Sequence, residues 1–224
     1  MTKSERYKKA YKDLTNKIEE TYSSKKITIP SYIRLGLLAK YCKSLQAIYW
    51  LEQKGYAEDA RIILRTLFEI FVTLVFCEEN SEERYKRFFD YNVFIRAKYI
   101  EENYDAIKEI FKLSLKELDV KKEEFRDKYH SNREKYHWND LSVKKLCQEL
   151  DSYYKTDKYS FLYLTVYTQY SDYIHPSVVN IFENYIEIGD KSLKVNVKAN
   201  KDELDTEIIE IIEEMNEELI KRVF

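Results

Sequence analysis

The scarcity of helix-breaking residues constrains the fold of this chain more than any other feature. Only three glycines and two prolines occur in 224 residues, and 35% of the residues are charged. Glycine and proline are the residues that interrupt helices most strongly, so the long segments between them favour helix. We therefore expect an all-α bundle of seven or eight helices. No linker divides the chain, and residues 1–224 are expected to form a single domain.

Apolar residues that recur every three or four positions locate the individual helices. Capping signals support their ends: Thr2 and Glu5 have capping-box spacing, as do Asn200 and Glu203, and Gly55 suits a helix C-terminus. The expected helices cover about residues 2–23, 30–55, 57–79, 80–113, 114–137, 140–150, 157–175 and 201–223. Asn139 or Asp140 is expected to cap the sixth helix and Asp157 the seventh. Alternating residues around a Gly-Asp turn predict a small β-hairpin near residues 185–197.

Charge and hydropathy exclude several classes of protein. The 38 basic and 40 acidic residues nearly cancel, so no global field draws the chain onto nucleic acid or an anionic membrane. The first residues contain no apolar stretch typical of a secretory signal, and the longest strongly apolar run, residues 70–77, is too short to cross a bilayer. We expect a cytoplasmic protein that does not contact the membrane.

The three cysteines, Cys42, Cys77 and Cys147, are odd in number, widely spaced and set in apolar or helical contexts. This pattern indicates reduced, buried thiols rather than disulfides or a zinc site. No metal and no cofactor is expected.

A charged pair stands inside the most apolar expected helix, AEDARIILRTLFEIFVTLVFCEE, which should lie at the centre of the bundle. Arg65 and Glu69 are one turn apart there, and their desolvation is costly unless both are satisfied. Two interpretations stay open. The pair is either buried and fixes helix register, or it lines a polar cavity in which Arg65 binds an anion that Glu69 orients. Arg61, one turn earlier, would complete a phosphate or carboxylate site.

The stretch YTQYSDYIHPS brings Ser171, Asp172 and His175 within one helical turn. A hydrolase triad would also need an oxyanion hole, and the sequence has no nucleophile-elbow glycine pattern. Pro176 ends or kinks the helix near His175, where the helix C-terminus favours a charged imidazole. His175 is thus a candidate general base or RNA-contacting group, and a structural histidine is the alternative.

A short repeat, RDKYH at residues 126–130 and REKYH at residues 133–137, would face one way on a helix. Its histidines, His130 and His137, lie two turns apart, whereas one metal ion on one helix needs ligands a single turn apart. The segment is therefore either a modest nucleic-acid surface or a solvated helix face.

Three stretches, taken in order, resemble a bacterial family known only as a domain of unknown function. They are AEDARIILRTLFEIFVTLVFC, HWNDLSVKKLCQEL and YSDYIHPS. The likeness covers about residues 35–185 and consists of an Arg-Thr-x-x-Glu helix, a Trp-led segment and a Ser-x-x-x-His-Pro/Gly-Ser stretch. The positions that this resemblance implies are Arg65, Glu69, Trp138, Ser171 and His175.

The all-α character of that family is similar to that of HEPN domains, helical bundles that often act as ribonucleases in toxin and anti-phage systems. HEPN domains use an arginine and a histidine separated by four to six residues. Both R-x-x-x-H stretches of this chain, which begin at Arg126 and Arg133, are one residue short of that pattern. Arg65 and His175 would have to meet from different helices.

The first functional hypothesis is a metal-independent, HEPN-like ribonuclease or toxin-type effector of a bacterial defence system, acting on RNA or another phosphate-bearing ligand. The expected catalytic residues are Arg65, Glu69 and His175, and the expected binding residues are Arg61, Trp138, Ser171 and Asp172. The alternative is a non-enzymatic interaction module or homodimer. Residues 114–137 and the last helix would then bind a protein partner, if the isoleucine-rich face of that helix exceeds what a small bundle buries.

Overall fold

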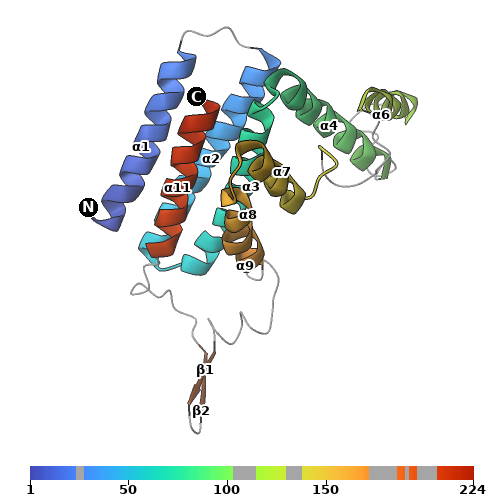
Figure 1. The fold of residues 1–224 in the computed structure, drawn as a ribbon. Coiled ribbons are helices and arrows are strands. Elements are labelled where there is room, and N and C mark those ends of the chain that lie inside the picture. The colour runs from blue at the N-terminus through green and yellow to red at the C-terminus, as the bar shows by residue number, and fades with distance from the viewer. Residues whose placement is uncertain (24–27, 103–114, 130–137, 172–185, 190–191, 196–205) are drawn as a thin grey trace.

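The structure of the chain is a computed structural model. It describes residues 1–23, 28–102, 115–129, 138–171, 186–189, 192–195 and 206–224. Within these ranges the protein is all-α, apart from two short paired strands, as the near absence of glycine and proline predicts. Figure 1 shows four long helices, α1, α2, α3 and α11, grouped as the main bundle, with α7, α8 and α9 against α3.

The first two helices begin and end at the expected signals. Helix α1 (Lys3–Tyr22) starts with the capping box of Thr2 and Glu5. Helix α2 (Ile29–Lys54) starts one residue before the expected Pro30, because Thr28 forms a second capping box with Ser31. Gly55 ends α2 in the left-handed conformation at φ 82°, which a residue without Cβ adopts readily. Helix α1 packs on both α2 and α11.

Helix α3 (Ala57–Glu78) is the central helix, as its apolar sequence predicts. It packs on α2, α4, α7, α9 and α11, and on the π-helical turn η1 described below. Helix α11 (Thr206–Val223) packs on α1 and α3 and buries most of its apolar face. The buried apolar residues of α11 are Ile208, Ile209, Ile211, Ile212, Met215, Leu219 and Val223. Most of the isoleucine-rich face is therefore buried in contacts within the chain. The capping box expected at Asn200 and Glu203 lies outside the described residues.

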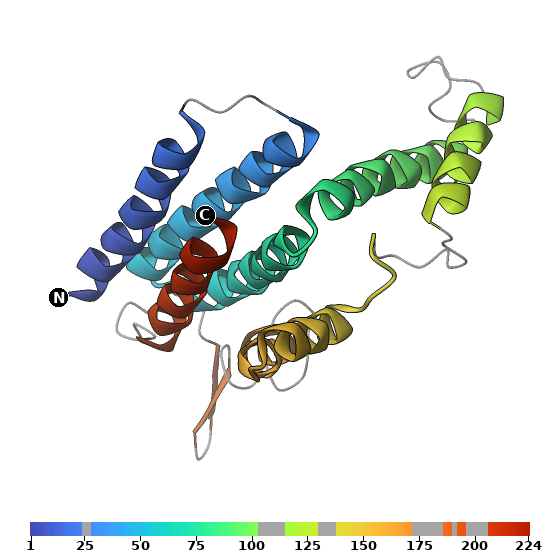
Figure 2. The same cartoon turned by 45° about the horizontal axis from the view of Figure 1, so that its top comes forward.

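Helices α4 (Ser81–Glu102) and α6 (Leu115–Tyr129) form an arm that extends from one end of the bundle (Figures 1 and 2). Helix α6 packs on α4, and buried Phe125 contacts the rings of Tyr91 and Tyr129 at centroid distances of 5.9 and 5.0 Å. The expected helix in residues 114–137 is thus confirmed for α6. His130 and His137 lie outside the described residues.

The sixth expected helix is α7 (Val143–Tyr154), and its cap is Ser142 instead of Asn139 or Asp140. The two expected caps have other partners. The Asn139 side chain accepts the Leu141 N–H at 3.0 Å, and Asp140 adopts a left-handed φ of 58° and pairs with Arg87 at 2.6 Å. These local contacts take both side chains away from the helix start.

The seventh expected helix is divided into α8 (Lys158–Leu162), the π-helix η1 (Tyr163–Thr168) and α9 (Gln169–Ser171). Asp157 makes no side-chain capping bond. Asp151 of α7 caps α8 in its place, because its carboxylate accepts the N–H groups of Tyr159 and Ser160 at 2.9 and 2.8 Å. The expected end near His175 lies outside the described residues.

Strands β1 (Ile186–Gly189) and β2 (Ser192–Val195) pair antiparallel within the range expected for a hairpin. The register places Ile186 opposite Val195 and Gly189 opposite Ser192. Figure 1 shows this ribbon beyond one end of the bundle, so it adds nothing to the helical core.

All three cysteines are buried and none is bridged. Burial raises the pKa of the Cys42 thiol to about 11 and that of Cys147 to about 12, so both are protonated near neutral pH. The expectation of reduced, buried thiols is confirmed. Within the described ranges, the helices are all too short or too polar to span a bilayer.

Candidate functional site

The pair of Arg65 and Glu69 lies at the surface edge of α3. Arg65 Nη2 is 3.5 Å from Glu69 Oε1, and the two side chains are 22% and 41% exposed. The pair is therefore only partly desolvated. Helix α3 is central, but the stripe that carries Arg61, Arg65 and Glu69 is only half-buried. Of the two interpretations, the register-fixing buried pair loses its basis, and a surface-accessible ion pair takes its place.

The Arg65 guanidinium stacks on an aromatic ring. Its Cζ lies 4.3 Å from the ring centroid of Tyr167, which is close enough for a cation–π interaction. Tyr167 stacks in turn on Tyr163, with centroids 5.2 Å apart and planes inclined by 18°. Tyr167 thus supports the guanidinium, and Tyr163 supports Tyr167.

The hydrogen-bonding capacity of Arg65 is largely unused. A guanidinium carries five N–H donors. Among the described residues, buried Arg65 Nε has no hydrogen-bond partner, and the ion pair with Glu69 is long. Nε is shielded from solvent, so an anion such as phosphate would bind through the terminal nitrogens of the partly exposed guanidinium.

The π-helix η1 places these tyrosines beside α3. It lies between α8 and α9 in one continuous helical run, and the Thr168 hydroxyl donates to the Tyr163 carbonyl five residues earlier at 3.3 Å. The Ser171 hydroxyl of α9 donates to the Tyr167 carbonyl. Single π-helical turns are frequent at functional sites because they re-aim the side chains that follow.

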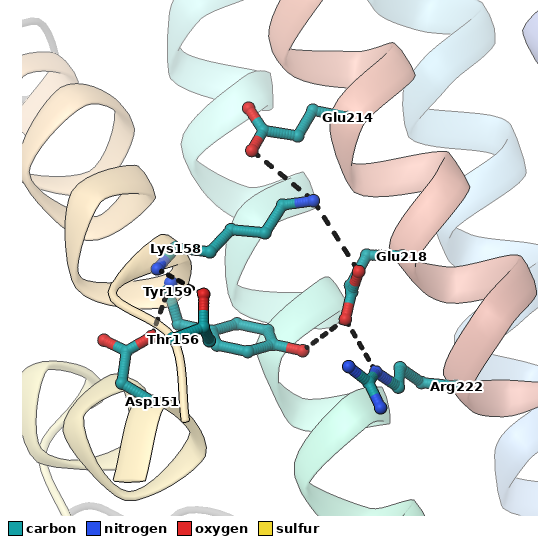
Figure 3. Close-up of polar contacts among 7 residues, drawn as sticks. All are labelled: Asp151, Thr156, Lys158, Tyr159, Glu214, Glu218 and Arg222. Atoms are coloured by element: carbon teal, nitrogen blue, oxygen red, sulfur yellow. Dashed lines mark hydrogen bonds and ion pairs between the residues drawn. The ribbon is translucent and has the colours of Figure 1, made fainter. Parts of the chain in front are cut away.

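A polar network anchors the start of this run to α11 (Figure 3). The Tyr159 hydroxyl donates to Glu218 Oε1 at 3.0 Å, and Arg222 Nε donates to the same oxygen at 2.7 Å. Lys158 lies 3.5 Å from Glu214 and 3.6 Å from Glu218. With Asp151 capping α8 from the other side, the segment that leads into η1 is held at both flanks.

The charges of this network shift the pKa values of its members. Burial would raise the pKa of Glu218, but the hydrogen bonds from Arg222 and Tyr159 outweigh it, and the pKa lies below its usual value. Burial, with the adjacent Glu218 carboxylate, raises the pKa of the Tyr159 phenol. The pair is thus a carboxylate and a neutral phenol at neutral pH, which stabilises the fold around η1.

The expected site residues that the structure describes lie on neighbouring helices. Ser171 lies on α9, which packs against α3, the helix that carries Arg61, Arg65 and Glu69. Asp172 and His175 lie outside the described residues. The sequence reasoning missed Tyr163 and Tyr167 as partners of Arg65. Their spacing of four residues was a signal for a shared face, but nothing local indicated which helix that face would meet.

Trp138, which was expected to bind a ligand, packs against other aromatic rings. Its indole is buried and meets the rings of Phe76 and Phe88 edge to face, with centroids 5.8 and 5.3 Å apart. Such a ring stabilises the junction of α3 and α4 and offers little surface to a ligand.

A second arginine–glutamate pair, which the sequence reasoning did not identify, is less exposed and has more partners. Arg34 of α2 contacts Glu78 of α3 at 2.5 Å (Nε to Oε1) and 2.6 Å (Nη2 to Oε2), and the two side chains are 16% and 13% exposed. The Tyr85 hydroxyl also donates to Glu78 at 2.6 Å, and Arg34 donates to the Tyr22 hydroxyl at 3.0 Å. Burial raises the pKa of Glu78, although Tyr85 and Arg34 oppose this effect.

Within the ranges that the structure describes, no group of three or more His, Cys, Asp or Glu side chains could hold a metal ion. No curated protein and no solved structure matches the chain significantly. One family model does match, over residues 31–193, which is well over half of the chain and includes Arg65, Glu69, Trp138, Ser171 and His175. The chain therefore belongs to the family of unknown function DUF5677.

Proposed function

We propose that the chain is a metal-independent ribonuclease of the HEPN kind, a toxin-type effector in bacterial defence, with Arg65 as its phosphate-binding group. The observation that carries the proposal is the state of Arg65. Its guanidinium is stacked on Tyr167, loosely paired with Glu69 and partly open to solvent.

The geometry of Arg65 suits an anion that arrives from solvent. Stacking on Tyr167 fixes the plane of the guanidinium, so little conformational freedom is lost when a phosphate binds. At 3.5 Å from Glu69 it has no tight carboxylate partner that a phosphate would have to displace. An arginine held in this way stabilises the negative charge that develops on phosphate oxygens during cleavage.

His175 supplies the proton transfer in this proposal. It follows Ser171 by four residues, and four residues of chain span at most about 14 Å. In this proposal His175 approaches Arg65 from the segment that follows α9, the helix that packs on α3. An imidazole titrates near neutral pH and can act as general acid or base towards a ribose hydroxyl or a leaving oxygen. Glu69 would orient the substrate or the guanidinium.

The test is cleavage of total RNA in EDTA by the purified chain and by its Arg65→Ala and His175→Ala variants. We expect Arg65→Ala to lower the rate roughly 100- to 1,000-fold and His175→Ala roughly 100- to 10,000-fold. Arg6→Ala is the control, because Arg6 is another partly exposed arginine that pairs with a glutamate, Glu213, outside the proposed site. Equal cleavage by all four proteins, or cleavage by none, would refute the proposal.

The interaction-module alternative now lacks the feature that motivated it. The isoleucine-rich face of α11 is buried against α1 and α3, so it gives no support to a partner-binding role for that helix. Helix α6 likewise buries Phe125 against the arm.

A further inference from the structure

A pocket of about 230 Å³ lies between α1 and α2, and none of the residues singled out from the sequence contributes to it. Its lining is mostly aromatic and includes Tyr7, Tyr11, Leu45, Tyr49, Trp50 and Lys8. Trp50 is 60% exposed, an unusual position for the largest apolar side chain of a protein.

Ring–ring contacts and hydrogen bonds of the tyrosine hydroxyl groups hold the rings around this pocket in place. The centroid of Tyr49 lies 5.5 Å from that of Tyr7 and 5.2 Å from that of Trp50. The Tyr7 hydroxyl donates to buried Glu52, and the Tyr49 hydroxyl is 3.0 Å from the Ser4 hydroxyl. The aromatic surface is therefore preorganised, and a planar ligand would stack on it without first ordering the side chains.

The one charged side chain that lines the pocket is basic, Lys8, and further exposed lysines lie along the two helices that flank it. Helix α2 carries a single carboxylate, Glu52, which is buried and paired with Lys3 at 2.7 Å. The exposed side chains Lys43, Gln46, Trp50 and Lys54 recur on α2 at intervals of three or four residues, so they share one face. Across the pocket, Lys8 and Lys12 are exposed one turn apart on α1. Glu5, the exposed carboxylate one turn before Lys8, bonds to the Thr2 N–H at the helix start.

Size and charge together indicate the ligand. Pockets that enclose a whole small molecule usually measure about 300–1,000 Å³, so one of about 230 Å³ accepts part of a larger ligand. Aromatic rings between lysines match a planar, apolar group whose neighbours on both sides are anionic. A base of a single-stranded nucleic acid, flanked by its phosphates, has that chemistry.

We propose that the groove between α1 and α2, called here the Trp50 groove, binds single-stranded RNA by stacking one base on Trp50 and pairing phosphates with Lys8 and Lys43. The choice of RNA over DNA rests on the proposed function. The stacking surface and its charge do not depend on cleavage.

The test measures the affinity for a fluorescein-labelled 12-residue oligouridine with 2′-O-methyl groups, which lacks the attacking hydroxyl and stays intact. Fluorescence anisotropy is followed for the wild-type chain and for Trp50→Ala, Lys8→Glu and Tyr153→Ala. Loss of one stacked base weakens binding about 5- to 150-fold, and this is the effect expected for Trp50→Ala. Lys8→Glu should weaken binding and flatten its dependence on salt.

The Tyr153→Ala variant is the matched control. Tyr153 is 61% exposed, as Trp50 is, but it lies on α7, so its removal should leave the affinity within about twofold. Both positions are exposed, and circular dichroism of each variant verifies that it is folded.

Three results would overturn the inference: no binding by the wild-type chain, equal binding by Trp50→Ala, or tighter Trp50-dependent binding of polyglutamate, which would indicate an acidic protein partner. The outcome is separable from that of the proposed function. Binding without cleavage of unmodified RNA keeps the groove and removes the ribonuclease. If the chain cleaves RNA and Trp50→Ala leaves the KM unchanged, the ribonuclease proposal stands and the groove proposal fails.

Discussion

The two arginine–glutamate pairs that involve α3 have the same chemistry and differ in their partners and in the exposure of the carboxylate. Arg34 and Glu78 join two helices through two short contacts, and two tyrosine hydroxyls complete the cluster. Arg65 and Glu69 lie on one helix with a single long contact and partial exposure. The first pair is a structural link between α2 and α3. The second leaves a guanidinium available to a ligand.

The difference shows what an ion pair needs in order to be structural. A buried charge is tolerated only when several partners compensate for its lost hydration, and such partners come from separate segments of the chain. Two opposite charges four residues apart on one helix have only each other as partners. Such an exposed ion pair stabilises the folded state by a few tenths of a kcal/mol. The pair that is obvious in the sequence is therefore the weaker one.

The largest expected effect is that of removing the buried carboxylate. Glu78→Ala should lower the free energy of unfolding by up to about 3–5 kcal/mol, the range for breaking a buried pair, because it leaves the mostly shielded Arg34 guanidinium without its carboxylate. The measurement is urea denaturation followed by circular dichroism. Its matched control is Glu69→Ala, for which a change of no more than about 1 kcal/mol is expected. Similar losses in the two variants would show that the two pairs are equivalent.

A smaller effect is expected when one hydrogen bond of the buried cluster is removed. Tyr85→Phe deletes the hydroxyl that donates to Glu78 and should lower the free energy of unfolding by about 1.5–3 kcal/mol, the range for hydrogen bonds to charged groups. Combining it with Glu78→Ala measures the coupling between them. Purely additive losses would contradict a shared network.

The cation–π contact of the exposed pair should contribute less. Tyr167→Leu should lower the free energy of unfolding by about 0.5–2 kcal/mol, through the loss of stacking on Arg65 and Tyr163. If Tyr167 orients Arg65 for phosphate, the same variant also raises the KM for RNA. Tyr91→Leu, at another half-buried tyrosine that packs on Phe125 and lies in neither proposed site, is the comparison. A KM that Tyr167→Leu leaves unchanged would mean that the stacking serves the fold alone.

The smallest expected effect concerns pH: the stability contributions of Glu78 and Glu218 should change in opposite directions as pH falls. The folded-state pKa of Glu78 is raised, so the stability that its protonation contributes is fully present below the unfolded pKa and is lost as pH rises through the folded value. The folded-state pKa of Glu218 is lowered, so its contribution is present above the unfolded pKa and is lost as pH falls through the folded value. Urea denaturation from about pH 7 to about pH 4 measures both.

The measured quantity is the difference in the free energy of unfolding between the wild-type chain and each glutamine variant. The titrations of all other groups cancel in this difference. With decreasing pH, the wild-type chain should gain stability relative to Glu78→Gln and lose it relative to Glu218→Gln. Gaps that move in the same direction would contradict the opposite pKa shifts.

Local signals predicted the helices well. The box at Thr2 and Glu5, the cap at Gly55 and the apolar periodicity of α3 all act within one or two helical turns, and each element begins or ends close to them. Prediction was poorer where a distant or competing partner was present. Asp151 replaced Asp157 as the cap of α8, and Asn139 and Asp140 were occupied elsewhere.

The sequence by itself determined that this chain is helical, where most of its helices lie and which family it belongs to, because helix formation depends on side chains a few residues apart. Only the tertiary structure decided that Glu78 is mostly shielded and paired with Arg34, that Arg65 is partly exposed and stacked on Tyr167, and that Trp50 lines a pocket. Burial and charge compensation are set by neighbours in space, and those neighbours are contributed by helices far apart along the chain.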